Sequence, residues 1–584
     1  MYTQYKSICI LIALLKEHNI RHVVISPGSR MRDFLLSVEE DPFFTCYSVV
    51  DERSAAYFAI GISQELNVPV AITCTSSTAT TNYLPGITEA FYQGVPLLVL
   101  TGDRDPYMLG QQEDQMIDQI NMYGKVVRKF VQLPIVNTDA DFWYCERLIN
   151  EAILELDHRG KGPVQINVPV PAIITWPTEY VDSLPEVRVI KRVTFKEDKT
   201  EMLQEKLQEI KNAQKILVLI GQKTNSVQEE LFIRFFKKYN CVFHAEHMGN
   251  LNIEGKINLA MLSQGLLDTE FDDFLPDVVI SCYGTLGISR NLKETFRKKK
   301  INHWLINENG NVVDAYKNLT TIFECEPTFF FNYFIEHAEV DLKNNEVYYN
   351  KWLEKYQAIS IPDTPFSHVS VIRDFLKRMP EKSLLHLSIL NSIRISHFFE
   401  LPADTRVYAN IGTDGIDGCM STFFGQSVVS QRLSFLIIGD LSFFYDMNSL
   451  RIRHIRNNVR ILLINNYGGN EFYQQPIRST TDNSIGAKHG NKAEGWAESV
   501  GFHYMTAQNE QEYNSKLNDF FKPVSDTPVL FEVFTKQMTD VDSLRLVQKS
   551  IRNIFDKNAA LKNTVRSVLG ETGIKTIKNI LGKK

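Results

Sequence analysis

The stretch that decides the fold is IIGDLSFFYDMNSLRIRHIRNNVRILLINNYGGNEF, from Ile437 to Phe472. An apolar run ends at Gly439-Asp440, and a polar, helix-like segment follows. A second apolar run, Val459 to Ile464, ends in the sequence NNYGG. This pattern predicts a β-α-β unit with Asp440 and Asn466 at the carboxyl ends of neighbouring strands, where open α/β sheets bind ligands.

The residue types at these strand ends suggest what could bind there. A carboxylate, a carboxamide and a glycine-rich backbone suit a hard cation that carries a diphosphate group. An ordinary α/β crossover with a Gly-Asp turn and an Asn-Gly turn would give the same pattern. This stretch alone does not decide between the two interpretations.

Size and composition limit the class of protein. A chain of 584 residues is too long for one core, so two to four domains are expected. A formal charge of −6 gives no general basic face, so nucleic acid is not an expected partner. The eight cysteines are scattered, without metal-ligand spacing, and the N-terminus lacks signal-peptide features. We therefore expect a cytoplasmic protein with reduced thiols.

The first 185 residues alternate short apolar runs with helical stretches, which predicts a parallel sheet covered on both faces. Polar clusters end or follow the predicted strands: Ser26–Arg30, Asp51–Arg53, Thr75–Asn82, Thr101–Pro106 and Asp114–Gln119. Each cluster alone is consistent with a capped helix start or a solvated surface.

In this order, however, the motifs resemble one family. They read ISPGSR, DERSAAYFAIGIS, PVAITCTSSTATTNYLPGITEA, PLLVLTGDRDP and EDQMIDQINMYGKVV, followed later by VYANIGTDGIDGCMSTFFG and GDLSFFYDMNSL. Together they are similar to the MenD-type synthases. These thiamin-diphosphate (ThDP) enzymes make 2-succinyl-5-enolpyruvyl-6-hydroxy-3-cyclohexene-1-carboxylate in menaquinone biosynthesis.

The resemblance implies an α/β fold with three doubly wound domains and parallel sheets. We expect a pyrimidine-binding domain over residues 1–185, a central domain over 200–340 and a diphosphate-binding domain over 362–550. Residues 175–199 and 341–362 are interpreted as linkers. Residues 551–584 are interpreted as a basic, amphipathic helical tail.

The resemblance also implies ThDP and Mg²⁺ as cofactors. Asp440, Asn466 and the backbone carbonyl of Gly468 would hold the metal. Glu52 would be the catalytic residue, hydrogen-bonded to N1′ of the aminopyrimidine, and burial beside an apolar ring would raise its pKa. The residues expected to bind the cofactor are Gly439, Asp440, Leu441, Ser442, Asn466, Gly415, Ile416 and Asp417, with Ile416 as the wedge that forces the two rings together.

The expected substrate residues include several departures from the family. Ile411 replaces an arginine that clamps a carboxylate, Glu471 replaces an apolar residue, and Ser77 replaces a glycine. Arg290, after Ser289, falls where the family has a Lys-Arg pair, and it is interpreted as a surface arginine. The full predicted set is Ser29, Arg30, Ser76, Ser77, Arg104, Gln115, Arg394, Ile411 and Glu471.

These departures lead to the hypothesis of a MenD-like carboligase. It would decarboxylate a 2-oxo acid and transfer the acyl-anion equivalent to an anionic acceptor, with substrates other than 2-oxoglutarate and isochorismate. The alternatives are the menaquinone-pathway synthase itself, a non-ligating 2-oxo acid decarboxylase and a non-enzymatic paralogue. The last is disfavoured because Glu52, Asp440 and Asn466 are all present.

The expected partners follow from the same resemblance. In this superfamily the pyrimidine half of each site comes from one subunit and the diphosphate half from another. Glu52 and Asp440 would therefore meet across the interface of a homodimer or a dimer of dimers. The basic tail could make weak contact with an anionic membrane surface, although a solvated helix or a partner-docking segment fits its pattern equally well.

Overall fold

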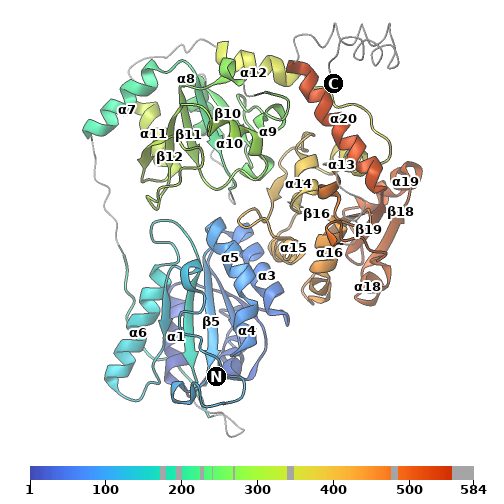
Figure 1. The fold of residues 1–584 in the computed structure, drawn as a ribbon. Helices are drawn as coiled ribbons and strands as arrows, with labels where there is room; N and C mark the ends of the chain where they lie inside the picture. Colours follow the sequence, from blue (N-terminus) through green and yellow to red (C-terminus); the bar gives the residue numbers. More distant parts are fainter. Residues whose placement is uncertain are drawn as a thin grey trace, which may run out of the picture.

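The computed structural model describes residues 1–170, 179–192, 200–223, 229–239, 241–267, 270–337, 347–474 and 484–555. Its three larger sheets form three lobes, blue, green and orange in Figure 1. Each of these sheets is parallel throughout, as the sequence predicted. The predicted tail beyond Phe555, with its membrane contact, lies outside the described residues. Within the described part of the chain, no helix is long and apolar enough to cross a membrane.

The N-terminal sheet has the strand order β3-β2-β4-β5-β7-β6. Its strands are continuous apolar runs because helices cover both faces; every residue of β4 and β5 is buried. The strands are β2 (His22–Ile25), β3 (Thr45–Ser48), β4 (Val70–Cys74), β5 (Leu97–Asp103), β6 (Phe130–Gln132) and β7 (Val164–Pro169). The helices are α1 (Lys6–Glu17), α2 (Arg32–Glu39), α3 (Glu52–Leu66), α4 (Thr78–Asn82), α5 (Leu84–Gln93) and α6 (Asp139–Leu154).

The central sheet has the order β10-β9-β11-β12-β13. Its strands are β9 (Ile216–Ile220), β10 (Val242–Ala245), β11 (Val278–Cys282), β12 (Asn302–Ile306) and β13 (Leu319–Phe323). Its helices are α7 (Thr200–Asn212), α8 (Glu229–Tyr239), α9 (Leu259–Leu262), α10 (Arg290–Phe296), α11 (Pro327–His337) and α12 (Val347–Gln357). Helix α12 lies inside the segment interpreted as a linker. It forms because Tyr348 and Trp352 are buried in the central core.

The C-terminal sheet has the order β15-β14-β16-β17-β19-β18. Its strands are β14 (Leu384–Leu387), β15 (Arg406–Tyr408), β16 (Ser434–Gly439), β17 (Val459–Asn465), β18 (His503–Ala507) and β19 (Val529–Phe534). Its helices are α13 (His368–Arg378), α14 (Asn391–Ser396), α15 (Cys419–Val429), α16 (Asp440–Tyr445), α18 (Glu494–Ser499), α19 (Glu510–Phe520) and α20 (Gln537–Phe555). The helix-like segment after Asp440 is the short α16 followed by the 3₁₀ turn Met447–Arg451.

The N-terminal and C-terminal sheets share one topology. Numbered within each sheet, the strands of both run 2-1-3-4-6-5. In this order the chain changes direction between the first and third strands, which are adjacent. Open α/β sheets bind their ligands in the crevice at this switch point. It lies at the ends of β2 and β4 in one sheet, and at the ends of β14 and β16 in the other.

The two outer sheets meet through helices α3 and α15, which share one hydrophobic core. The helices cross at Gly61 and Gly425. A Cβ atom on Gly61 would lie 2.0 Å from the carbonyl oxygen of Thr422, and one on Gly425 would lie 1.9 Å from that of Phe58. Glycine is required at this crossing because the two backbones leave no room for a side chain.

A polar contact fixes the start of α3 against the end of α16. Arg53 donates to the carbonyl of Tyr445 (3.1 Å), and Asn448 donates to the Asp51 carboxylate (2.8 Å). Arg53 also lies 3.8 Å from the carboxylate of Asp446, which is fully buried. Burial raises the pKa of Asp446 to about 7 despite its hydrogen bonds from Ser421. The two residues flanking Glu52 are thus fixed to the C-terminal lobe of the same chain.

The helix crossing predicts a steric effect. We expect Gly61→Ala to lower the free energy of unfolding by about 1–3 kcal/mol, because the added methyl group forces two backbones apart. Gly495→Ala in α18 is the control, since a Cβ there meets nothing within 4 Å. It should leave stability unchanged or raise it by up to about 1 kcal/mol. Urea unfolding measures both, and equal stabilities would contradict the tight crossing.

The buried Asp446 predicts a pH effect. Between its ordinary pKa of 3.8 and the folded-state value of about 7, the folded protein keeps a proton that the unfolded chain has lost. Its contribution to stability is therefore present at low pH and is lost as the pH rises through this window. We expect Asp446→Asn to reduce the fall in unfolding midpoint between pH 4 and pH 7. The exposed Asp519→Asn should keep the parent slope, and an unchanged slope for Asp446→Asn would refute the assignment.

Candidate active site

The three predicted metal ligands come together at the carboxyl edge of the C-terminal sheet. Asp440 begins α16 directly after β16, and Asn466 and Gly468 follow the neighbouring parallel strand β17. Oδ2 of Asp440 accepts hydrogen bonds from the backbone N–H groups of Asn466 (3.1 Å) and Gly468 (3.0 Å). Its Oδ1 accepts from the N–H of Leu441 (2.7 Å). One buried carboxylate therefore organises both loops.

The side chain of Asn466 is oriented by Asp540, which the sequence analysis did not identify. Nδ2 of Asn466 donates to Oδ2 of Asp540 (2.9 Å), so the amide oxygen remains as the free acceptor. Asp540 is fully buried and also accepts from Thr535 Oγ1 (2.7 Å) and from the backbone N–H of His368 (2.8 Å). Asp540 lies on α20, 74 residues beyond Asn466, and no local motif marks it.

The site also fits a bound polar group. Both amide atoms of Asn470 are buried without a hydrogen-bond partner, and a buried unpaired amide is costly unless a ligand satisfies it. Gly468 has φ = 154°, and a Cβ there would lie 2.7 Å from the carbonyl of Gly486. A carboxylate, an amide oxygen and a glycine backbone suit Mg²⁺ with a diphosphate. Among the described residues, no group of three or more His, Cys, Asp or Glu offers a different metal site.

Ile416, the predicted wedge, lies against the start of α16. Ser442 donates to the backbone carbonyl of Ile416 (2.9 Å) and accepts from Ser388 (3.3 Å). Asp417 accepts from the hydroxyl of Tyr57 (3.1 Å). The predicted cofactor segments Gly439–Ser442 and Gly415–Asp417 are thus side by side at the β14/β16 switch point.

Glu52, the predicted catalytic residue, is the first residue of α3. Asp51 caps this helix by accepting from the backbone N–H of Ser54 (3.1 Å). Burial, together with the charge of Asp51, raises the pKa of Glu52, as proton sharing requires. Within the described residues, no hydrogen bond or ion pair joins Glu52 to Asp440.

The predicted substrate residues of the N-terminal domain gather at the β2/β4 switch point and the end of β5. The backbone N–H of Arg30 donates to Thr75 Oγ1 (3.3 Å), which also lies 3.5 Å from Gln115 Nε2. Ser76 donates to the carbonyl of Gln115 (2.9 Å). Ser77 has φ = 74°, consistent with glycine being the family residue there. Ser29 and Arg30 form the short 3₁₀ turn after β2.

The two arginines of this cluster lie close to each other and to the carboxylates of Asp103 and Glu113. Burial and the charge of Arg104 lower the pKa of Arg30, and neither Nε atom has a hydrogen-bond partner. Nη1 of Arg104 pairs with Glu113 (2.6 Å), which the sequence analysis did not identify. Glu113 lies two residues before Gln115, and its charge gave no signal because surface acids are common.

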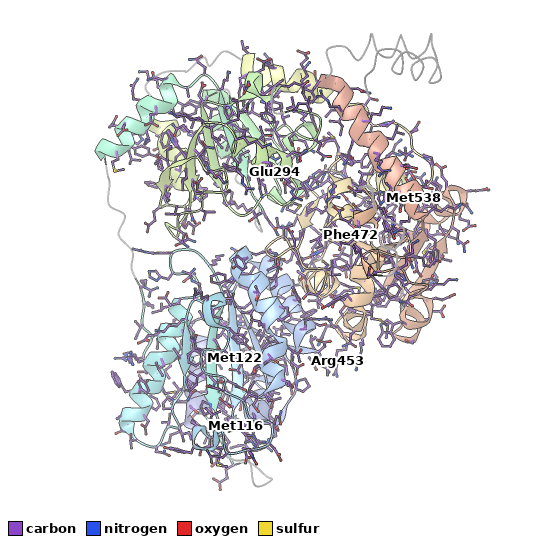
Figure 2. All side chains as sticks on the ribbon, in the orientation of Figure 1. Met116, Met122, Glu294, Arg453, Phe472 and Met538 are labelled. Carbon is purple, nitrogen blue, oxygen red and sulfur yellow. The ribbon has the colours of Figure 1, made fainter. Side chains whose placement is uncertain are left out.

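The remaining predicted substrate residues do not form one cluster. Arg394 and Glu471 form a bidentate ion pair, Nη1–Oε2 2.6 Å and Nη2–Oε1 3.1 Å. Ile411 is buried in the core, and a Cβ on Gly287 of the central domain would lie 3.0 Å from its Cγ2. Arg290 is a surface arginine, as expected, with its side chain 86% exposed and paired with Glu294, which is labelled in Figure 2.

Comparison with known proteins finds similar thiamin-diphosphate enzymes. The family described as "Thiamine pyrophosphate enzyme, N-terminal TPP binding domain" matches residues 9–122. The chain is 38% identical to the 2-succinyl-5-enolpyruvyl-6-hydroxy-3-cyclohexene-1-carboxylate synthase of Phocaeicola vulgatus, over 95% of this chain and 100% of that protein. It is 37% identical to the synthase of the same name from Bacteroides thetaiotaomicron (93% and 98%) and 32% identical to that from Flavobacterium psychrophilum (92% and 97%). The chain belongs to the 2-succinyl-5-enolpyruvyl-6-hydroxy-3-cyclohexene-1-carboxylate synthase family of ThDP enzymes.

Proposed function

We propose that this enzyme uses ThDP and Mg²⁺ to decarboxylate a 2-oxo acid and to join the remaining acyl unit to an anionic acceptor. The observation that carries the proposal is the cluster of Asp440, Asn466 and Gly468 at the carboxyl ends of β16 and β17, together with the unpaired amide of Asn470. ThDP, when bound, accepts the electron pair released as the C1–C2 bond of the 2-oxo acid breaks and CO₂ leaves.

The protein's own groups have distinct roles in this proposal. Asp440, the amide oxygen of Asn466 and the carbonyl of Gly468 hold Mg²⁺. Burial raises the pKa of Glu52, which favours sharing a proton with the aminopyrimidine N1′. Arg30 supplies positive charge for the acceptor, since its buried Nε atom has no hydrogen-bond partner, whereas Arg104 is already paired with Glu113.

The active site is proposed to form between two copies of the chain. Within the described residues no hydrogen bond or ion pair joins Glu52 to Asp440, and Arg53 fixes the start of α3 to the end of α16, the helix that Asp440 begins. Glu52 of one subunit would therefore serve the metal cluster of another, in a homodimer or a dimer of dimers. Neither half contains the complete set of groups.

A second candidate is the reaction that gives the relatives their name, which uses 2-oxoglutarate and isochorismate. It is supported by similarity along almost the whole chain and by the retention of Arg30, Arg104 and Gln115. Ile411 and Glu471 favour a different donor substrate instead. Isoleucine cannot pair with a carboxylate, and the Arg394 guanidinium is already paired with the carboxylate of Glu471.

A substrate panel tests these proposals. CO₂ release from a series of 2-oxo acids should require ThDP and Mg²⁺ and should rise when an anionic acceptor is added. Glu52→Gln should slow turnover about 10²–10⁴-fold because the proton on Glu52 is lost, while ThDP still binds. Efficient use of 2-oxoglutarate with isochorismate would favour the second candidate. CO₂ and free aldehyde with every acceptor would point to a simple decarboxylase, and no CO₂ from any 2-oxo acid would refute the proposal.

The role of Asp540 predicts a change in metal affinity. We expect Asp540→Asn to weaken Mg²⁺ binding about 10–100-fold, because an amide offers one acceptor oxygen where Asp540 uses two, so the hydrogen bonds that orient Asn466 cannot all be kept. Calorimetric titration of the ThDP-loaded protein with Mg²⁺ measures this without turnover. Asp542→Asn, an exposed acid two residues away on α20, is the matched control. Equal Mg²⁺ affinities of the two variants would contradict a role for Asp540 in the metal site.

A further inference from the structure

The Arg394–Glu471 ion pair spans the edge of the sheet where the metal cluster lies. Arg394 comes from α14, which follows β14, and Glu471 from the 3₁₀ turn Asn470–Gln474, which follows β17. In the order β14-β16-β17, these strands flank β16, which ends at Asp440. The pair therefore bridges the loops on either side of the proposed cofactor site. Figure 2 labels Phe472, the residue after Glu471, in this domain.

The pair is built into the protein by further hydrogen bonds. Arg394 Nη1 also donates to Asn391 Oδ1 (3.1 Å). Gln474 Nε2 lies 3.3 Å from both Glu471 Oε2 and Asn391 Oδ1. The two charged side chains are only 26% and 32% exposed, so solvent screens them less than it would a surface pair. A substrate carboxylate that bound Arg394 would have to displace the Glu471 carboxylate. The two negative charges would then lie side by side.

Two apolar side chains lie close to the loop that carries Glu471. Cδ2 of Phe472 and Cδ1 of Leu441 both lie within 4 Å of the position that a Cβ on Gly469 would occupy. Ile411 contributes no charge where the family has an arginine. A neutralised guanidinium next to apolar side chains suits an uncharged group better than a second carboxylate.

We propose that the Arg394–Glu471 pair makes this enzyme select 2-oxo acids whose far end is uncharged, and discriminate against those that carry a second carboxylate. This inference rests on the proposed function. It identifies Glu471 as the residue that sets donor specificity, because its carboxylate is paired with the Arg394 guanidinium. The far end of the donor packs near Phe472 and Leu441, while the 2-oxo acid group faces the cofactor.

Two donors of equal length provide the test. 2-Oxovalerate and 2-oxoglutarate both have five carbons, and they differ in the charge of the far end. We expect the wild-type enzyme to show a kcat/KM at least about 10-fold higher for 2-oxovalerate, the discrimination expected from one charge-assisted contact. Glu471→Gln frees Arg394, so the ratio should move toward 2-oxoglutarate by about 10–100-fold. Adding Arg394→Leu to that variant should abolish the gain.

A matched control and a binding measurement keep the test decisive. Glu294→Gln breaks the exposed Arg290–Glu294 pair on α10 and should leave the ratio unchanged. Binding of valerate and glutarate to the ThDP-loaded protein, measured by calorimetry, should follow the same order and reverse in Glu471→Gln. This readout stands even if no 2-oxo acid is turned over, an outcome that would refute the proposed function alone. A wild-type preference for the dicarboxylates, or a ratio unmoved by Glu471→Gln, would overturn the inference.

Discussion

The hydrogen bonds that the Asp440 carboxylate accepts from two backbone N–H groups are the constraint on which the proposed site depends. They join the end of β16 to the loop after β17, and they place Asn466 and Gly468 around one buried anion. Such an anion is stable only when it is fully hydrogen-bonded or bound to a cation. Asp540 extends the arrangement by fixing the amide of Asn466, so the position of this potential oxygen ligand is set by a residue outside the ligand set.

The shared topology of the two outer sheets explains why predicted residues collect in two places. In each sheet the connections leave the adjacent first and third strands in opposite directions, and open α/β sheets bind their ligands where such loops diverge. Ser29, Arg30 and Ser76 lie at one such crevice, and Asp440, Ser442 and Ile416 at the other. The α3–α15 crossing and the Arg53 contact hold the sheets together, but they fix Glu52 at the end of α16 rather than at its start. This geometry is the physical basis for proposing a site shared between subunits.

Cofactor binding and substrate selection use different kinds of residue in this chain. The proposed cofactor residues are buried, hydrogen-bonded and anchored at strand ends. Ile411 and Glu471, the residues proposed to alter the donor, differ from them in adding an apolar side chain and a negative charge. Replacing a cation by an apolar side chain, and occupying another cation with a carboxylate, both reduce the positive potential offered to a donor. Specificity can change in this way without loss of the scaffold.

Much of the fold could be predicted from the sequence. Apolar runs that end in polar or glycine-containing clusters indicated the parallel strands, and ordered motifs such as ISPGSR and GDLSFF indicated the cofactor and the residues near it. These signals are local, because strand burial and turn chemistry act over a few residues. Asp540, Glu113 and the Arg394–Glu471 pair could not be predicted, since each depends on a partner brought close only by packing. Helix α12 formed within a predicted linker for the same reason. The sequence by itself determined the elements and the chemical groups at their ends, whereas the tertiary structure decided which of those groups neutralise one another, because charge pairing depends on distance in space rather than along the chain.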